Sequence, residues 1–198
     1  MFPDSLKVQG FFTNNKTTTT HSGMWLLMSD TSGHIETGYG TAGGSTAGAR
    51  RSKITSGANA LATASWQHVV CRLRGATDMD ILRDGTDIGG AYSGSGGAIG
   101  YAARSAVIGS ISGGNFMNGR IAEVGFWSVS LSDAEVTALV RGVSPLMVRP
   151  GSLLGYWPVY GQASPEIDLS PSHAPMTLEG TAPLANHAPV GCPFPVAV

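Results

Sequence analysis

The apolar residues of this chain fall in short runs that glycine-rich and polar segments separate. Residues 66–74 alternate between apolar and polar side chains, which is the pattern of a half-buried strand. Residues 23–28 form a continuous apolar run of the length expected for a fully buried strand. Short strands with glycine turns between them are typical of a sandwich or a barrel. Further strands are predicted at residues 6–12, 34–39, 78–83, 86–88 and 105–109.

Residues 6–12 are the first predicted strand, and alternation predicts which of its side chains point inward. Leu6, Val8 and Phe12 share one face of a regular strand, so we expect them to point inward. Residues 13–23 contain four consecutive threonines and few apolar side chains, and they are predicted to form an exposed loop.

Asp84 and Gly85 stand between two of the predicted strands and give the strongest hairpin signal in the chain. A two-residue type I′ turn needs positive φ at both central positions, and Asp-Gly is one of the pairs that tolerate this. The sequence therefore predicts a tight hairpin at this point.

Residues 120–142 contain the clearest local signals for secondary structure in the chain. Residues 120–127 are rich in β-favouring side chains and place apolar groups on both faces, which predicts a central strand covered on both sides. Ser132 is a suitable N-cap, and Glu135 three residues later completes a capping box. Gly142 can take the left-handed position that ends a helix. These signals predict one short α-helix at about residues 133–141.

Four motifs resemble those of laminin-G-like domains of the concanavalin A and pentraxin type. Residues 116–136 are similar to the late strand and short helix of that family. Residues 65–70 and 81–85 resemble its W-x-H-V-V and L-x-x-D-G hairpin, and residues 153–158 and 178–181 resemble its L-V-A-Y-W-P and L-x-G-T strands. The residues expected to define the fold are Trp66, Asp84, Gly85, Gly119, Arg120, Trp127, Ser132, Glu135, Tyr156 and Trp157.

The resemblance implies an all-β fold, an antiparallel two-sheet jelly-roll sandwich of the concanavalin A-like kind. Residues 1–198 are expected to form a single laminin-G-like domain, which also fits their length. Ten of the eleven prolines lie in residues 145–195, and proline cannot donate to a sheet ladder. We therefore expect residues 143–198 to be a Pro-rich return segment that contributes strands near 153–157 and 176–180.

Composition and charge argue against several classes of partner. A net charge of −1 gives no electrostatic basis for binding nucleic acid or an anionic membrane, and no apolar run approaches the length of a membrane span. The first residues lack the basic and apolar regions of a signal peptide, so we expect synthesis in a bacterial cytoplasm without one. Cys71 and Cys192 are expected to be reduced thiols, and a disulfide between them is left open.

No catalytic constellation is visible, so we expect a protein that is not an enzyme. Residues 38–43 match G-x-G-x-x-G, but no helix is predicted after them to face a pyrophosphate. Glu166 and Asp168 have the spacing of the carboxylate pair in jelly-roll glucanases, but Ser170 and Pro171 stand where the third carboxylate belongs. We interpret the two acids as a solvated loop pair. The five histidines are scattered and form no zinc motif.

Cofactors and metals have little support in the sequence, and none is predicted. Laminin-G-like domains sometimes bind calcium through loop carboxylates. Asp30, Asp84 and Asp87 lie in predicted turns but form no recognisable ligand cluster. Turn formation is the favoured interpretation of these three residues, and calcium binding is left open.

Three tyrosines are the candidates for sugar contact. Tyr39, Tyr92 and Tyr101 border glycine-rich loops, where exposed aromatic rings of a lectin-like sandwich could stack on sugar rings. Ordinary anchoring of the loops is the favoured alternative.

The resemblance also guides the functional hypotheses. The proline-rich ending is similar to that of laminin-G-like proteins common in tailed bacteriophages. The first hypothesis is therefore a non-enzymatic virion structural protein, a capsid decoration or a head or tail appendage. It would be located in the virion, and its partners would be other virion proteins and further copies of itself. The alternative is a carbohydrate-binding, lectin-like adhesion module that contacts host-surface glycans, and the lower alternative is a degenerate glycosidase.

Overall fold

The computed structural model describes residues 1–14, 16–17, 19–103, 105–111, 114–159, 164–179 and 185–188. The fold is mostly β and antiparallel with one short α-helix, as the sequence predicts. The chain divides into two compact units, a first unit of residues 2–119 and a second unit of residues 120–198 with Met1. The expectation that they form a single domain stays a prediction.

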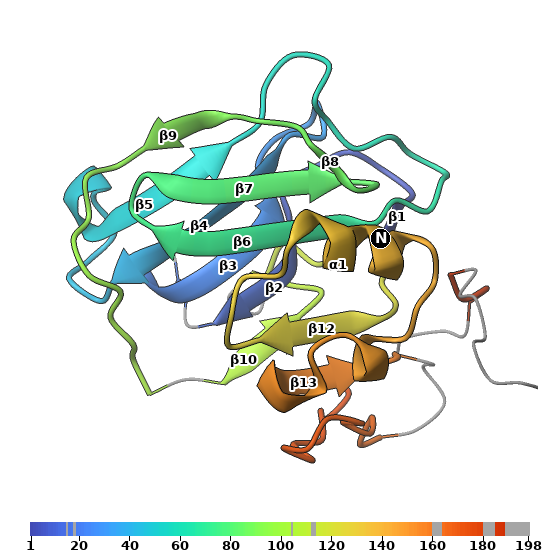
Figure 1. The fold of residues 1–198 in the computed structure, drawn as a ribbon. Coiled ribbons are helices and arrows are strands. Elements are labelled where there is room, and N and C mark those ends of the chain that lie inside the picture. The colour runs from blue at the N-terminus through green and yellow to red at the C-terminus, as the bar shows by residue number, and fades with distance from the viewer. Residues whose placement is uncertain are drawn as a thin grey trace, which may run out of the picture. The chain divides into compact units, whose positions relative to one another are not determined.

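A six-stranded antiparallel sheet forms most of the first unit, in the strand order β10-β2-β3-β4-β5-β9 (Figure 1). The short 3-10 helix η1 (Ala47–Ala49) leads into β5. The strands are β2 (Gln9–Asn14), β3 (Ser22–Met28), β4 (Ile35–Thr41), β5 (Arg50–Ile54), β9 (Ala91–Ser93) and β10 (Ala106–Ile108).

A three-stranded sheet of the same unit lies over one face of the six-stranded sheet (Figure 1). Lys53 on β5 donates from Nζ to the carbonyl of Met79 at 2.8 Å, so the two sheets are tied directly. Met28 and Ile35 from one sheet and Met79 and Ile81 from the other are fully buried and contribute to the core. The strands are β6 (Val69–Gly75), β7 (Asp78–Arg83) and β8 (Thr86–Asp87).

The predicted hairpin is confirmed between β7 and β8. Asp84 and Gly85 have φ values of 51° and 83°, as a type I′ turn requires. The Asp84 carboxylate also accepts a hydrogen bond from the backbone N–H of His68 at 2.8 Å, which fixes the turn against the start of the neighbouring strand β6.

The inward direction predicted for Val8 on the first strand is wrong, and Leu6 and Phe12 are only half-buried. β2 begins at Gln9 rather than Leu6, and a register shift between Gly10 and Phe12 breaks the regular alternation. Phe11 is therefore the buried aromatic residue at 2% exposure, whereas Val8 is 40% exposed. The loop predicted to start at Thr13 starts later, because β2 continues to Asn14.

The strand predicted at residues 120–127 is interrupted. β11 (Gly119–Arg120) pairs with β1 (Phe2–Pro3), and β12 (Val124–Trp127) pairs with β13 (Leu153–Trp157). Glu123 lies between β11 and β12 with a φ of 56°, a left-handed conformation that a strand cannot contain. Its N–H donates to the carbonyl of Pro158 at 3.1 Å.

The predicted helix is confirmed as α1 (Asp133–Val140). Both halves of the capping box are present, because Ser132 Oγ accepts from the Glu135 N–H while the Glu135 carboxylate accepts from the Ser132 N–H. At the other end Gly142 has a φ of 86° and donates to Leu139 at 2.9 Å. The N–H of Val143 donates to Ala138 at 3.0 Å, which completes a Schellman motif.

Among its described residues, the return segment contributes one strand, β13, at the first of the two places expected. At the second, Met176 makes only an isolated bridge to Glu166, and Gly180 lies outside the described residues. Two short 3-10 helices precede β13, η2 (Pro145–Met147) and η3 (Pro150–Ser152). No helix in the described part of the chain has the length and apolar character needed to cross a membrane.

Candidate functional site

One face of the six-stranded sheet gathers polar and aromatic side chains from several strands. Directly paired residues share a face, so the register places Trp25 of β3, Gly38 of β4 and Ser52 of β5 in one row across the sheet. The adjacent rows contain Arg50, paired with Gly40, and Glu36, which pairs with Leu27 on β3. His21 precedes β3 and shares the face of Trp25 by alternation.

Trp25 is the centre of this group. Its indole Nε1 donates to the Glu36 carboxylate at 3.1 Å. The Lys16 ammonium lies over the indole, 5.2 Å from the ring centroid, and the His21 ring lies 5.7 Å from it between centroids. We define the Trp25 cluster as Lys16, His21, Trp25, Glu36, Arg50 and Ser52.

Glycines on this face allow the chain to pass close to the sheet. A Cβ on Gly40 would lie 2.0 Å from the backbone carbon of His21, and a Cβ on Gly23 would lie 2.2 Å from the carbonyl oxygen of Asn14. Gly38 and Gly40, the first two glycines of the G-x-G-x-x-G match, therefore serve strand packing in β4, not phosphate binding. Their lack of side chains lets His21 approach Arg50 and Trp25.

Three polar atoms of the Trp25 cluster are buried without a hydrogen-bond partner among the residues that the structure describes. They are His21 Nδ1, Arg50 Nε and Ser52 Oγ. His21 and Ser52 are buried, whereas Lys16, Glu36 and Arg50 are partly exposed. A buried polar atom without a partner costs about 1–3 kcal/mol, so such atoms indicate a place where water or a ligand binds.

The electrostatics of the cluster follow from its burial and its two cations. Burial lowers the pKa of the Lys16 ammonium, Glu36 acts in the opposite direction, and Arg50 lowers the pKa further. Burial, followed by the charges of Lys16 and Arg50, lowers the pKa of His21 to about 4. His21 is therefore a neutral imidazole at pH 7, and the cluster presents more hydrogen-bond donors than acceptors.

A glycine-rich loop brings Tyr101 to the same end of the sheet. Gly96 donates to the Arg50 carbonyl at 2.7 Å, and Gly100 donates to the Gly40 carbonyl at 2.8 Å. Tyr101 follows directly and is 63% exposed. Of the three tyrosines predicted from the sequence, it best meets the requirement for a free aromatic face.

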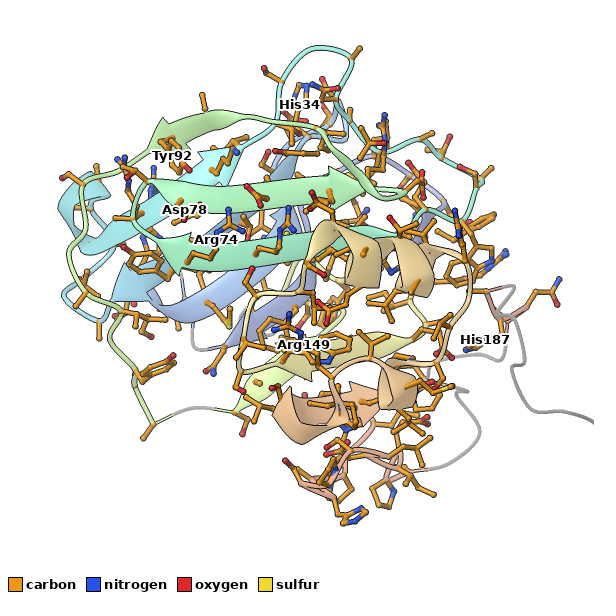
Figure 2. The ribbon with its side chains drawn as sticks, in the orientation of Figure 1. His34, Arg74, Asp78, Tyr92, Arg149 and His187 are labelled. Atoms are coloured by element: carbon orange, nitrogen blue, oxygen red, sulfur yellow. The ribbon has the colours of Figure 1, made fainter. Side chains whose placement is uncertain are left out.

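Tyr92 has an exposed fraction of 36%, but its ring is already engaged. The Arg51 guanidinium lies 5.0 Å and the Lys53 ammonium 5.6 Å from its ring centroid. Its hydroxyl accepts from the Met79 N–H at 3.0 Å, which anchors β9 to β7 (Figure 2). This supports the loop-anchoring alternative for Tyr92.

Tyr39 does not have the exposed ring that the hypothesis of sugar stacking requires. It lies within β4 and is only 8% exposed, because β4 runs on to Thr41 before the glycine-rich loop begins. Tyr39 lies on a strand, as predicted, but its buried ring does not fit the candidate role in sugar stacking.

Acidic and basic side chains on β6 and β7 form a separate network (Figure 2). Arg72 and Arg74 both contact the Asp80 carboxylate, at 2.7 and 2.9 Å, and Arg74 also pairs with Asp78 at 2.5 Å. The two arginines and the two aspartates neutralise each other. The network therefore stabilises the pairing of β6 with β7 and has little capacity to bind a ligand.

The interpretation of Asp168 as a solvated residue is wrong. Asp168 is buried, and its carboxylate accepts hydrogen bonds from the N–H groups of Tyr156, Ser170 and Ala174 at 2.8 to 2.9 Å and from Ser170 Oγ at 2.9 Å. Burial raises the pKa of Asp168, but these donors outweigh it and hold the pKa below its usual value. Glu166 lies nearby in the isolated bridge to Met176.

Asp30, Asp84 and Asp87, the three aspartates considered for calcium binding, accept backbone hydrogen bonds at turns, as the turn interpretation expects. Asp30 accepts from the Ser32 N–H at 2.8 Å and Asp87 from the Gly89 N–H at 2.9 Å, while Asp84 binds His68 as described above. The described residues contain no group of three or more His, Cys, Asp or Glu side chains able to hold a metal ion. Calcium binding itself remains untested.

Four other fold-defining residues, Trp66, Trp127, Tyr156 and Trp157, make contacts that fix neighbouring segments. Trp127 Nε1 donates to the Val148 carbonyl at 2.8 Å, and Trp157 Nε1 donates to the Ala174 carbonyl at 3.0 Å. The Tyr156 hydroxyl donates to the Glu123 carboxylate. The ring of Trp66 packs edge-on against that of Phe2, with 5.6 Å between centroids.

The sequence did not single out Lys16, His21, Glu36 and Arg50 as a group. They come from four segments, and their common position depends on the register of β3, β4 and β5. One available signal was alternation, which puts His21 and Trp25 on the same face. Lys16 lies in a polar segment and gave no signal of its own.

Cys192 lies outside the described residues. Burial raises the pKa of Cys71 to about 12, so its thiol stays protonated.

Comparisons with known proteins agree with the fold. A family model described as the concanavalin A-like lectin/glucanases superfamily matches residues 3–137. A crystal structure from Bacteroides ovatus ATCC 8483, described as a "putative carbohydrate binding protein", superposes with a TM-score of 0.60 at 18% sequence identity. The match covers 96% of this chain but only 56% of that protein. No curated protein matches the sequence.

Proposed function

Since the chain belongs to the concanavalin A-like lectin/glucanases superfamily, we propose that it is a carbohydrate-binding module without catalytic activity. Its ligand contacts the Trp25 cluster and the Tyr101 loop. The observation that carries this proposal is the convergence of three buried polar atoms, His21 Nδ1, Arg50 Nε and Ser52 Oγ, on one sheet face, where none of them has a hydrogen-bond partner among the described residues.

Sugar hydroxyls suit these atoms chemically. A hydroxyl both donates and accepts, so a pyranose can satisfy an Arg N–H, a neutral imidazole nitrogen and a serine hydroxyl at once. The exposed Tyr101 ring supplies the apolar surface on which the C–H face of a sugar packs. The structural neighbour, described in terms of carbohydrate binding, supports the proposal only at the level of the fold.

The proposed lack of catalysis is supported by the hydrogen bonds of two carboxylates, Glu36 in the first unit and Asp168 in the second. Most glycosidases need two carboxyl groups on either side of the glycosidic bond. Glu36 is bound to the Trp25 indole, and Asp168 has its oxygens occupied by four donors in the second unit. Neither side chain has the free, paired geometry that an acid and a nucleophile require.

A glycan array probed with the purified protein tests the proposal. We expect selective binding that Tyr101→Ala weakens about fivefold, the loss expected when about 1 kcal/mol of aromatic packing is removed. Phe116→Ala is the matched control, because Phe116 is another aromatic residue with 63% exposure. It should leave binding unchanged. Absence of binding to every glycan, or equal loss in both variants, would contradict the proposal.

Catalysis is tested on the glycans that bind. Incubation of these oligosaccharides with the protein should release no reducing ends. Hydrolysis that Glu36→Gln or Glu166→Gln abolishes would show instead that the protein is a glycosidase.

The virion role stays a prediction from the sequence. It remains compatible with glycan binding, since a virion decoration can also contact host glycans. Light scattering after size exclusion tests it, because a decoration or fibre protein is expected to form a symmetric oligomer. Neighbouring genes that encode capsid or tail proteins would give independent support.

A further inference from the structure

We propose that the ligand of the Trp25 cluster carries an anionic group, a carboxylate or a sulfate, which Lys16, His21 and Arg50 bind. This inference rests on the proposed carbohydrate-binding function and specifies its ligand as an acidic glycan.

The balance of charge in the cluster favours an anion. Lys16 and Arg50 contribute two cations, and the charge of Arg50 lowers the pKa of Lys16. Glu36 is the one acid of the cluster, and its carboxylate already accepts the Trp25 indole N–H at 3.1 Å. An additional negative group would offset the remaining positive charge, which a neutral sugar hydroxyl cannot do.

The unpartnered atoms favour an acceptor of hydrogen bonds. Arg50 Nε is a donor only, and Ser52 Oγ and the neutral His21 ring can both donate. Carboxylate and sulfate oxygens accept several hydrogen bonds without donating any, and bonds between an ionised donor and an ionised acceptor are about twice as strong as neutral ones. The partly exposed Lys16 and Arg50 can contact a ligand from solvent, and the buried His21 and Ser52 lie behind them.

Four other basic side chains of the first unit have their charges or donors engaged. Arg72 and Arg74 pair with Asp80, and Lys53 Nζ donates to the Met79 carbonyl at 2.8 Å. Arg51 donates to the carbonyls of Ala76 and Gly94. The Trp25 cluster differs from these sites because Arg50 Nε has no such acceptor within the described part of the chain.

Anion binding at this position should be linked to protonation. Lys16, Glu36 and Arg50 are the charged groups near His21. Burial is the largest cause of the low pKa of His21 in the free protein, and the charges of Lys16 and Arg50 lower it further. A bound anion reverses this effect and raises the pKa of His21 and of Lys16. Binding therefore takes up protons, so affinity for an acidic glycan should rise as the pH falls from about 7 to about 5.

The test uses an array that carries neutral, carboxylate-bearing and sulfate-bearing oligosaccharides, with half-saturation concentrations measured in physiological salt. We expect the strongest binders to be acidic, and Lys16→Gln and Arg50→Gln each to weaken their binding about tenfold. Lys7→Gln is the matched control, since it removes the same charge from an exposed residue of the same unit. It should change binding less than twofold, and comparing the two acidic classes identifies the anionic group.

Several outcomes would overturn the inference. If the strongest binders are neutral, or if Lys16→Gln binds acidic glycans as well as the unchanged protein does, the inference fails while the proposed function stands. If Lys7→Gln weakens binding as much as Lys16→Gln, the acidic glycan is attracted by the overall charge of the protein and not by the Trp25 cluster, and the inference also fails. If no glycan binds, both the inference and the proposed function fail. If Arg50→Gln does not fold, Lys16→Gln still tests the inference, because Lys16 lies outside the strands. The melting curve of the Lys16→Gln variant, compared with that of the unchanged protein, checks that the variant is folded.

Discussion

At the scale of single residues, Asp168 and Arg50 illustrate two ways of placing a charge in a protein interior. Asp168 is buried with four donors directed at its two oxygens, so its charge is fully compensated. Arg50 retains a buried Nε without a partner among the described residues. Because a compensated charge supports the fold and an uncompensated donor adds a cost to it, we assign Asp168 a structural role and Arg50 a role in binding.

Asp168→Asn should destabilise the protein by about 2–4 kcal/mol, because the amide NH2 would face the donors Ser170 Oγ or Ala174 N–H. The pKa of Asp168 is lowered in the folded state, so its stabilisation is present above the unfolded pKa and is lost as the pH falls through the folded pKa. Urea unfolding at several pH values should show that the variant loses less stability than the unchanged protein below about pH 4. Equal acid sensitivity of both proteins would contradict this account.

At the scale of elements, local signals determine α1 but not the strand before it. Ser132, Glu135 and Gly142 supply their own hydrogen bonds and backbone geometry within a few residues of the helix ends. The break between β11 and β12 depends on Glu123, whose side chain accepts from the Tyr156 hydroxyl and whose N–H bonds to Pro158. These partners lie far along the chain from Glu123, so no local pattern could indicate the break.

Ser132→Ala should lower the free energy of unfolding by about 1 kcal/mol, because the Glu135 N–H loses its acceptor at the helix start. Ser65→Ala, an exposed serine outside the helices and strands, is the control and should change stability by less than about 0.5 kcal/mol. Chemical denaturation of both variants measures the difference. An equal effect of the two substitutions would show that the capping box contributes nothing.

At the scale of the whole molecule, the two compact units raise the question of cooperativity. The first unit contains the six-stranded and three-stranded sheets, and the second contains β12, β13 and α1. A length of 198 residues and the family match across residues 3–137, which extends past the boundary at residue 120, both fit one domain. We therefore expect the units to unfold together.

Differential scanning calorimetry should show a single transition, with the calorimetric enthalpy equal to the van't Hoff enthalpy. Two transitions would contradict the prediction of a single domain. In that case Ser132→Ala should shift only one of them, which would assign that transition to residues 120–198.

The sequence by itself determined the elements whose causes are local. The Asp84-Gly85 hairpin, the capping box at Ser132 and Glu135 and the strand at β13 were all predictable, because turn geometry, capping and apolar runs depend on neighbouring residues. The all-β class followed from the same spacing of short strands and glycine turns.

Only the tertiary structure decided which side chains meet. The register of β3, β4 and β5 brings His21, Trp25, Glu36 and Arg50 to one face, and a shift of one residue in any strand would place its side chain on the opposite face. The same dependence on distant partners buried Asp168, which the sequence alone placed in solvent. The candidate site is a product of strand pairing, and pairing is set by packing across the whole sheet rather than by any short segment.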